Sequence, residues 1–134
     1  MKNKKPLPEK CACDSGKTFE TCCGPYLQNL NIAPTAEALM RSRYTAYTRY
    51  DVDYLLLTWH ASTRPQTIEF EENNTPKWFR LEVVKHYQDA MVFDKATVEF
   101  IAAYKINGRA YRLHETSSFY RERGQWYYVE GVVH

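Results

Sequence analysis

The 134-residue chain lacks the features that would assign it to a membrane, a secretory route or a nucleic acid. No apolar run reaches the roughly 18 residues of a membrane-spanning helix. The amino terminus has no hydrophobic stretch after its basic residues, which a secretory signal would require. Lys and Arg number 18 against 16 acidic residues, so the net charge of +2 does not favour nucleic acid as a partner. We therefore expect a cytoplasmic protein with no membrane attachment.

Cysteine is absent from residues 24–134, and all four cysteines lie within a short segment: Cys11, Cys13, Cys22 and Cys23. In a reducing compartment such a cluster favours a metal site over a disulfide framework. Two close pairs on either side of an eight-residue loop can clasp one tetrahedral ion with zinc–sulfur bonds of about 2.3 Å. Crossed disulfides, an iron–sulfur cluster or redox thiols, and free thiols are the alternatives. We predict one structural Zn²⁺, with no coordination position left open for catalysis.

The remaining composition indicates one domain that is rich in strands. Tyr, Phe and Trp number 11, 6 and 3 and make up 15% of the chain, which favours strands and ring-lined cavities over a helical bundle. A chain of this length can bury one core. We divide it into a flexible basic tail over residues 1–10, a metal motif over 11–30 and an α+β domain over 31–134.

The cysteine spacing resembles a known zinc module. The pattern C-x-C-x8-C-C, with S-G-K starting two positions after the second cysteine, resembles the SEC-C motif that is also found at the carboxyl terminus of the translocase motor SecA. Ala12 and Asp14 replace the usual Pro and Gly. Asp14 must then make the turn of that glycine, and Asp tolerates left-handed backbone. The resemblance implies a zinc knuckle that docks a protein partner, as the SecA motif contacts a chaperone and the ribosome.

Two helices are expected after the motif. The stretch TAEALMRSRYTAYTRYD has apolar residues at helical spacing, with Thr35 as N-cap. The stretch DVDYLLLTWH predicts a shorter second helix, with Asp51 as N-cap and Trp59 on its apolar face. His60, at its end, is either favoured there by the helix dipole or acts as a ligand or proton shuttle.

Arg43 lies on the apolar face of the first helix, where a guanidinium needs a carboxylate or a carbonyl as partner. In one interpretation its stem covers apolar surface and its head reaches water. In the other it anchors an anion or forms a buried ion pair, for which Glu115 is our candidate. The following residues, 61–77, predict a loop with a short strand near Ile68 and Phe70.

From Trp78 onward the apolar period becomes two, which predicts strands. The expected apolar rows are Phe79, Leu81 and Val83, and then Val98, Phe100, Ala102 and Tyr104.

Two turns set the register of the strands that follow. A two-residue turn at Asn107-Gly108 pairs Ile106 with Arg109, Tyr104 with Tyr111, Ala102 with Leu113 and Phe100 with Glu115. A second turn at Arg123-Gly124 pairs Phe119 with Tyr128 and Ser117 with Glu130. Polar groups then share an otherwise apolar face, where a carboxylate needs a donor or has a raised pKa.

These elements predict an α+β roll, in which helices pack across a curved antiparallel sheet and leave a cone with an open mouth. The segments CCGPYL, APTAEALMRSRYTAY, DYLLLTWH and TVEFIAAYKINGRAYRLHETSSFYRERGQWYYVEG, in this order, resemble the bacterial YchJ-like family. The resemblance implies a cystatin-like, nuclear transport factor 2-like cone preceded by a SEC-C motif, in a family with no established enzymatic activity. Some relatives bear a second SEC-C motif, for which this chain has no further cysteine.

Functions of different classes stay open at this point. The first hypothesis is a non-catalytic adaptor that contacts a protein partner through the zinc knuckle. The alternative is a small-molecule ligand in the cone, with or without chemistry of the isomerase or dehydratase type. A scaffold without a ligand is the third. The candidate pocket residues are Arg43, Tyr44, Trp59, His60, Glu115, Trp126 and Tyr128.

Overall fold

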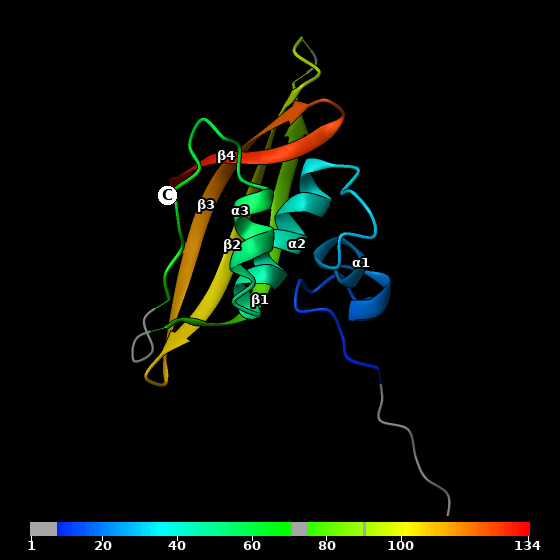
Figure 1. The fold of residues 1–134 in the computed structure, drawn as a ribbon. Helices are drawn as coiled ribbons and strands as arrows, with labels where there is room; N and C mark the ends of the chain where they lie inside the picture. The colour runs from blue at the N-terminus through cyan, green and yellow to red at the C-terminus, as the bar shows by residue number, and fades with distance from the viewer. Residues whose placement is uncertain (1–7, 71–74, 90) are drawn as a thin grey trace, which may run out of the picture.

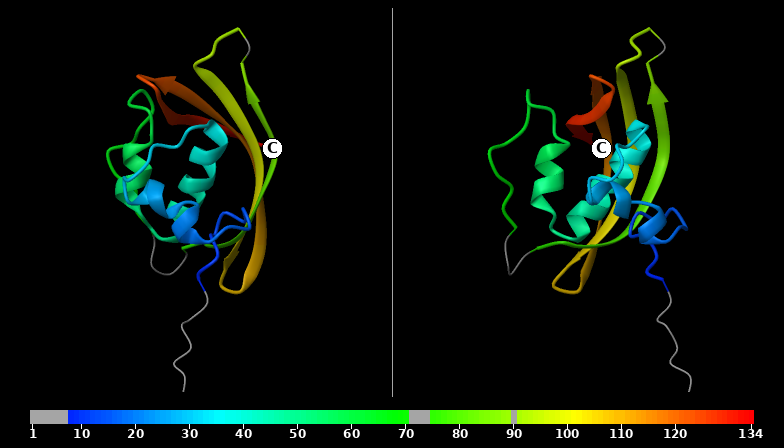
Figure 2. Two further views of the ribbon diagram at one scale, coloured as in Figure 1. Left: turned by 90° about the vertical axis from the view of Figure 1, so that its right-hand side faces the viewer. Right: turned by 45° about the vertical axis from the view of Figure 1, so that its right-hand side comes forward.

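The computed structural model describes residues 8–70, 75–89 and 91–134. Helical segments come first: the 3-10 turn η1 (Phe19–Thr21), α1 (Gly24–Leu27), α2 (Ala36–Thr48) and α3 (Val52–Leu57). Four strands follow: β1 (Lys77–Gln88), β2 (Lys95–Ile106), β3 (Arg109–Glu122) and β4 (Gln125–Val133). The strands pair in the order β1-β2-β3-β4, all antiparallel, and the curved sheet wraps around α2 (Figures 1 and 2). The predicted α+β architecture is confirmed.

Both predicted helix caps form. The Thr35 hydroxyl accepts a hydrogen bond from the Ala38 N–H at 3.0 Å, and the Asp51 carboxylate accepts one from the Tyr54 N–H at 3.0 Å. Each side-chain oxygen therefore satisfies one of the N–H groups that a helix leaves unpaired at its start. Gly24-Pro25 begins the short helix α1, with the proline in its first turn, where its missing N–H costs nothing.

The second helix is shorter than predicted, because the chain leaves it to pair with the sheet. α3 ends at Leu57, so Trp59 and His60 lie beyond it. The Tyr128 N–H donates to the Thr58 carbonyl at 2.8 Å, and the His60 N–H donates to the Tyr128 carbonyl at 2.7 Å. Residues 58–60 thus cover the outer edge of β4. No strand forms at Ile68 or Phe70, and residues 71–74 of the predicted loop lie outside the described residues.

The hairpin at Asn107-Gly108 has the predicted register. Ile106 pairs with Arg109, and the three further predicted pairs out to Phe100 and Glu115 also form. In β1 one prediction is wrong: Phe79 is 51% exposed, because a register shift between Trp78 and Arg80 turns it away from the core. Leu81 keeps its place in the apolar row and is buried.

The second hairpin departs from the prediction by one residue. Phe119 pairs with Tyr128 as expected, but a register shift follows and Ser117 pairs with Gly131 instead of Glu130. Glu130 pairs with Ser118 and is exposed, so the prediction that it lies on the apolar face is wrong. An irregularity of this kind moves the residues beyond it to the opposite face of the strand.

The core lies between α2 and the concave face of the sheet. It includes the fully buried Leu39 and Val98 and extends without a break to Cys13 and Cys23 of the knuckle. Here "knuckle" means residues 11–30. Of the predicted basic tail, residues 1–7 lie outside the described residues. None of the helices in the described ranges has the length and apolar character needed to cross a membrane.

Candidate functional site

The amino-terminal loop folds back on itself and brings the two cysteine pairs together. The Cys11 N–H donates to the Lys17 carbonyl at 2.9 Å, and the Phe19 N–H donates to the Glu9 carbonyl at 2.8 Å. The turn between them needs left-handed backbone at Asp14, with φ of 60°, and at Gly16, with φ of 86°. Asp therefore does adopt the conformation that the missing glycine would supply.

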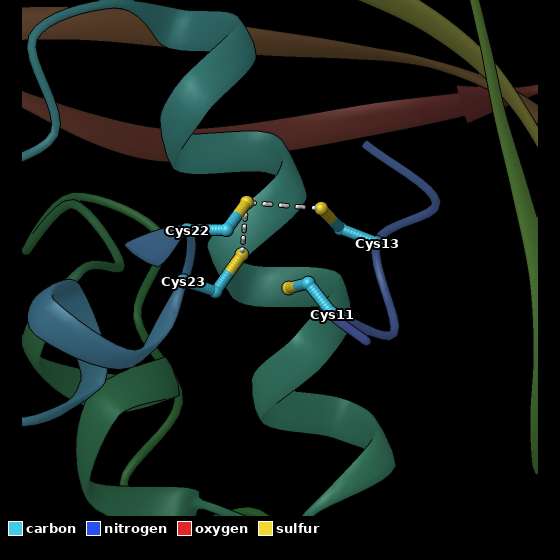
Figure 3. A group of neighbouring side chains, drawn as sticks. All are labelled: Cys11, Cys13, Cys22 and Cys23. Atoms are coloured by element: carbon cyan, nitrogen blue, oxygen red, sulfur yellow. Dashed lines mark hydrogen bonds between the residues drawn. The ribbon is translucent and has the colours of Figure 1, made fainter. Parts of the chain in front are cut away.

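The four sulfur atoms face one another (Figure 3) and lie within 4.8 Å of one another. The Cys13 and Cys22 sulfurs are 3.5 Å apart, and those of Cys22 and Cys23 are 3.9 Å apart. A tetrahedral ion with bonds of about 2.3 Å requires sulfur separations of about 3.8 Å. None of the four thiols is in a disulfide. The cluster therefore fits a single tetrahedral metal ion with all four sulfurs as ligands.

Charge in the sulfur cluster also favours a cation. The pKa of the Cys11 thiol is lowered because the Cys13 and Cys23 thiols hydrogen-bond to it. The pKa values of Cys13 and Cys23 are raised, first by their hydrogen bonds to Cys11 and further by burial. Burial and the crowding of the thiols thus oppose ionisation of all of them together, and a divalent cation would remove that penalty.

The knuckle is fastened to both the helix and the sheet. Arg41 of α2 donates to the Cys13 carbonyl at 2.8 Å and pairs with Glu37 at 3.2 Å. The Asp14 carboxylate accepts a hydrogen bond from the Leu81 N–H of β1 at 2.8 Å. The knuckle therefore packs against the α+β domain as part of its wall.

A second candidate site is a cavity of about 260 Å³ between α2 and the concave face of the sheet. It is mostly aromatic and aliphatic, with a few polar groups. Its lining residues are Met40, Arg43, Tyr44, Tyr47, Trp78, Phe100, Ala102, Leu113, Glu115, Ser117, Phe119 and Tyr128. Below, "cone cavity" means this space.

Arg43 is held in the wall of the cone cavity and is 5% exposed. Its Nη1 donates to the Leu55 carbonyl at 2.8 Å and to the Thr58 hydroxyl at 2.7 Å. Its guanidinium lies over the rings of Tyr128 and Trp59, 4.6 and 5.1 Å from their centroids. Its head group is buried and does not reach water, so the first interpretation is wrong. It also makes no ion pair with a carboxylate of the described residues. The predicted pairing with Glu115 is wrong, because carbonyl, hydroxyl and ring faces hold the arginine instead.

Glu115 lines the same cavity but has a different partner. Its carboxylate accepts a hydrogen bond from the Ser117 hydroxyl at 2.8 Å and lies against the backbone of Gly131. A Cβ at Gly131 would be 2.5 Å from the Glu115 Cδ, so a side chain there would displace the carboxylate. The cone cavity thus contains one buried cation and one carboxylate that are not paired with each other.

Tyr128 and Tyr44 of the cone cavity stay neutral at neutral pH. Burial, with a further contribution from the charge of Glu115, raises the pKa of Tyr128 to about 12. Burial also raises the pKa of Tyr44, whose hydroxyl has no hydrogen-bond partner among the described residues. Neither phenol is therefore suited to act as a base at neutral pH.

The structure separates the other candidate pocket residues from the cone cavity. Trp59 supports Arg43 and packs edge-on against Tyr128, 5.0 Å between ring centroids. Trp126 is buried beneath a shallow groove near α3. His60 lies in another depression, described below. Arg43, Tyr44, Glu115 and Tyr128 all line the cone cavity.

Sequence reasoning missed several cavity residues. Tyr47 lies in the stretch with helical spacing, and Ser117 was paired on the strand face, but neither was proposed for the pocket. Both follow from patterns already in the sequence: Tyr47 lies one turn after Arg43, and Ser117 lies two residues after Glu115. Trp78 lacked such a signal, because it enters the cavity only through the register shift in β1.

Taken together, the fold and the sites define a class: a cone-shaped α+β domain with a four-cysteine knuckle at its amino-terminal side. Residues 35–131 match the family described as "YchJ, middle NTF2-like domain". The chain therefore belongs to the YchJ-like family, as its motifs suggested.

Curated relatives agree with this assignment. The chain is 47% identical to a UPF0225 protein of Chromobacterium violaceum over 99% of both chains. It is 52% identical to a UPF0225 protein of a Polaromonas species, over 87% of this chain and 85% of the relative.

Solved structures that resemble this chain belong to proteins that contain a SEC-C motif. One is a SEC-C motif containing protein from Rhodopseudomonas palustris, with a TM-score of 0.79 and 36% identity over 91% of this chain and 96% of the other. Another is a SEC-C motif containing protein from Psychrobacter arcticus, with a TM-score of 0.74 and 25% identity over 96% and 83% of the two chains.

Proposed function

We propose that this chain is a zinc-stabilised protein that binds a small organic molecule in the cone cavity. The observation that carries the proposal is the buried guanidinium of Arg43, which lines a cavity of about 260 Å³ without a carboxylate partner among the described residues. A buried charge is costly to keep unless something compensates it. Around Arg43 a carbonyl, a hydroxyl and two ring faces do so in part, without a negative charge. A ligand with an anionic acceptor group would complete that compensation.

The size and lining of the cone cavity support a small ligand. Binding sites for drug-sized molecules span roughly 300–1,000 Å³, so this space suits something smaller. Arg43 offers N–H donors, and the Glu115 carboxylate offers an acceptor. A ligand with a carboxylate or carbonyl at one end, a donor at the other and an apolar ring between them would match these groups.

In this proposal the metal is zinc and its role is structural. Four thiolates around a tetrahedral ion leave no position for substrate, and they are the ligand set typical of structural zinc. The ion would hold the knuckle against α2 and β1, and therefore hold the wall of the cone in place.

The test is a ligand screen by NMR on the zinc-loaded protein, using small aromatic acids with and without a hydroxyl or amino group. We expect binding that shifts the resonances of residues around the cavity. Ala102→Leu, which fills space at a cavity-lining residue with 1% exposure, should abolish binding.

The matched control is Ala103→Leu, since Ala103 is the neighbouring residue of β2 and lines a depression on the other face of the sheet. It should leave binding unchanged. If Ala102→Leu and Ala103→Leu bind every hit equally well, the cone cavity is not the site and the proposal fails.

A second candidate function, docking of a protein partner, is favoured by apolar side chains next to the knuckle. Leu30 is 71% exposed, Ile32 is 64% exposed and Leu57 of α3 is 49% exposed. Exposed apolar residues that cluster can mark an interaction site. Ile32→Asp should then lose partners that the wild-type protein captures in a pull-down, while Val132→Asp, an equally exposed residue of β4, should keep them. Equal capture by both variants would refute docking at this surface.

A further inference from the structure

A hydrogen-bonded chain of three side chains lies outside both sites described so far. The Ser62 hydroxyl is 2.7 Å from Nδ1 of His60, and Nε2 of His60 is 3.1 Å from the Glu122 carboxylate. Ser62 and His60 come from the segment that follows α3, and Glu122 comes from the end of β3. The three residues meet because residues 58–60 pair with the edge of β4.

The contacts define which nitrogen of neutral His60 carries the proton. The backbone N–H of Ser62 points at Nδ1, 3.1 Å away, and an N–H group can only donate. Nδ1 is therefore the acceptor, and Nε2 carries the hydrogen and donates it to Glu122. The Ser62 hydroxyl must then donate to Nδ1 as well. The hydroxyl thus donates to the imidazole, and the imidazole donates to the carboxylate. A nucleophile, a general base and the carboxylate that orients the base are linked in the same order in hydrolases of this kind.

The His60 ring is fixed while the hydroxyl beside it is accessible. Tyr120 and Tyr127 pack edge-on against the ring, with centroids 5.6 and 5.9 Å away. The His60 side chain is 19% exposed, and Ser62 is exposed. A base that is held by packing and by a carboxylate keeps its orientation during proton transfer.

The three hydrogen-bonded residues lie beside a depression of about 490 Å³, which is separate from the cone cavity. Ser62 and His60 line it, together with the apolar surfaces of Tyr87, Val129 and Tyr120. Lys95 also lines it, beside the carboxylates of Asp89 and Glu130, and its ammonium group can donate hydrogen bonds there. The depression can therefore hold an apolar group next to the hydroxyl and contains a donor for an oxygen that gains charge.

We propose that Ser62 is a nucleophile toward small acyl esters, with His60 as its base and Glu122 as the residue that orients His60. The Ser62 oxygen attacks the acyl carbon while its proton passes to Nδ1. The bond from the acyl carbon to the leaving oxygen then breaks, and the leaving alcohol takes the proton from Nδ1. Water repeats the sequence on the acyl-serine, losing its proton to Nδ1, and releases the acid and free Ser62. No oxidant or cofactor is needed.

The test uses the zinc-loaded full chain with two probes. A fluorophosphonate should form an adduct at Ser62, located by peptide mass spectrometry, with loss of fluoride. The protein should also hydrolyse 4-nitrophenyl butyrate. Ser62→Ala should lose both the adduct and the hydrolysis. Glu122→Gln, which keeps the size of the side chain, should lower the rate of labelling at least about tenfold, since correct orientation of the imidazole depends on the carboxylate.

Two control variants distinguish a reaction at Ser62, His60 and Glu122 from unspecific reactivity of the depression. Ser118→Ala and Glu130→Gln remove a serine and a carboxylate that line it without contacting His60, and both should react like the wild type. Because Ser62 and Glu122 are exposed, their variants should fold, which circular dichroism checks. Absence of a Ser62 adduct in the wild type, or an unchanged labelling rate in Glu122→Gln, overturns the proposal. Neither result bears on ligand binding in the cone cavity.

Discussion

The knuckle and the cone share helix α2 but differ in what holds them in place. Arg41 and Arg43 lie two residues apart on this helix, and the first donates to a knuckle carbonyl while the second is buried in the cavity wall. The knuckle offers sulfur atoms, a few backbone hydrogen bonds and the margin of the apolar core, whereas the cone offers four paired strands and most of that core. Two neighbouring regions can therefore depend on different chemistry, one on a cation and the other on burial. The experiments below test that difference, beginning with the largest expected effect.

Replacing one buried sulfur should collapse the knuckle and leave the cone folded. Cys13 has 0% exposure, and Cys13→Ser should abolish metal binding, which contributes roughly 10–16 kcal/mol at neutral pH in comparable sites. Metal analysis and hydrogen exchange of residues 11–30 and of β2 and β3 measure the two regions separately. Ser15→Ala is the control, because it removes a hydroxyl 3.1 Å from the Cys22 sulfur and keeps all four ligands. Retained metal in Cys13→Ser would contradict the comparison.

High pH should weaken the packing of α3. Burial raises the pKa of Tyr54 in α3, which is 6% exposed, from its ordinary value of 10.0 to about 12. The folded state thus binds this proton more tightly than the unfolded chain does. The stabilisation is complete below pH 10 and is lost as the pH rises through about 12, by about 2–3 kcal/mol for this residue.

Urea unfolding between these pH values, with tyrosinate absorbance as a second probe, measures this effect. Tyr54→Phe should reduce the loss. Acid should instead weaken the knuckle, because protons compete with the metal for the thiolates. If both regions respond to pH in parallel, the comparison is wrong.

Gly131→Ala should damage the cone alone. The added Cβ would meet the Glu115 Cδ at 2.5 Å, so the carboxylate must move or the strand must shift. Overpacking of this kind costs about 1–3 kcal/mol. Thermal unfolding measures it, and Val132→Ala, at a neighbouring and 63% exposed position, is the control. Unchanged metal content should accompany the lower stability. An unaltered melting temperature would mean that the close approach of Glu115 is not present in solution.

Asp14 offers the smallest change and tests the link between the two regions. Asp14→Ala removes the acceptor of the Leu81 N–H and keeps a Cβ at a φ of 60°, so it should cost about 1–2 kcal/mol. Asp14→Gly loses the same hydrogen bond but relieves the backbone, and should be the milder variant. Chemical denaturation compares the two. If Asp14→Gly is the more damaging, the flexibility of the loop outweighs the relief of backbone strain. Wild-type stability in both variants would mean that the carboxylate contributes nothing.

Local sequence signals predicted the parts of the fold that depend on near neighbours. Thr35 and Asp51 act as helix caps through contacts three residues away, and Asn107-Gly108 sets the register of a whole hairpin from two residues. The cysteine spacing likewise predicted the cluster, because its geometry is defined within one short loop.

The failures concern contacts between distant segments. The irregularity beside Phe119 has no turn residue to mark it, so Glu130 was assigned to the wrong face. The end of α3 is determined by Tyr128, some seventy residues later, which pairs with Thr58 and His60. The partners of Arg43 were also hidden, because the Leu55 carbonyl and the Thr58 hydroxyl come 12 and 15 residues later, and the sequence does not specify how that segment packs against α2.

The bond between Asp14 and Leu81 has a consequence for how copies of this protein behave together. β1 is an edge strand, and such a strand can template the addition of another chain unless it is covered. Residues 58–60 pair with the opposite edge at Tyr128, and on β1 the Asp14 carboxylate of the cysteine loop occupies the Leu81 N–H. Loss of the metal would therefore free a donor in the middle of the β1 edge, where the strand of a second copy could pair.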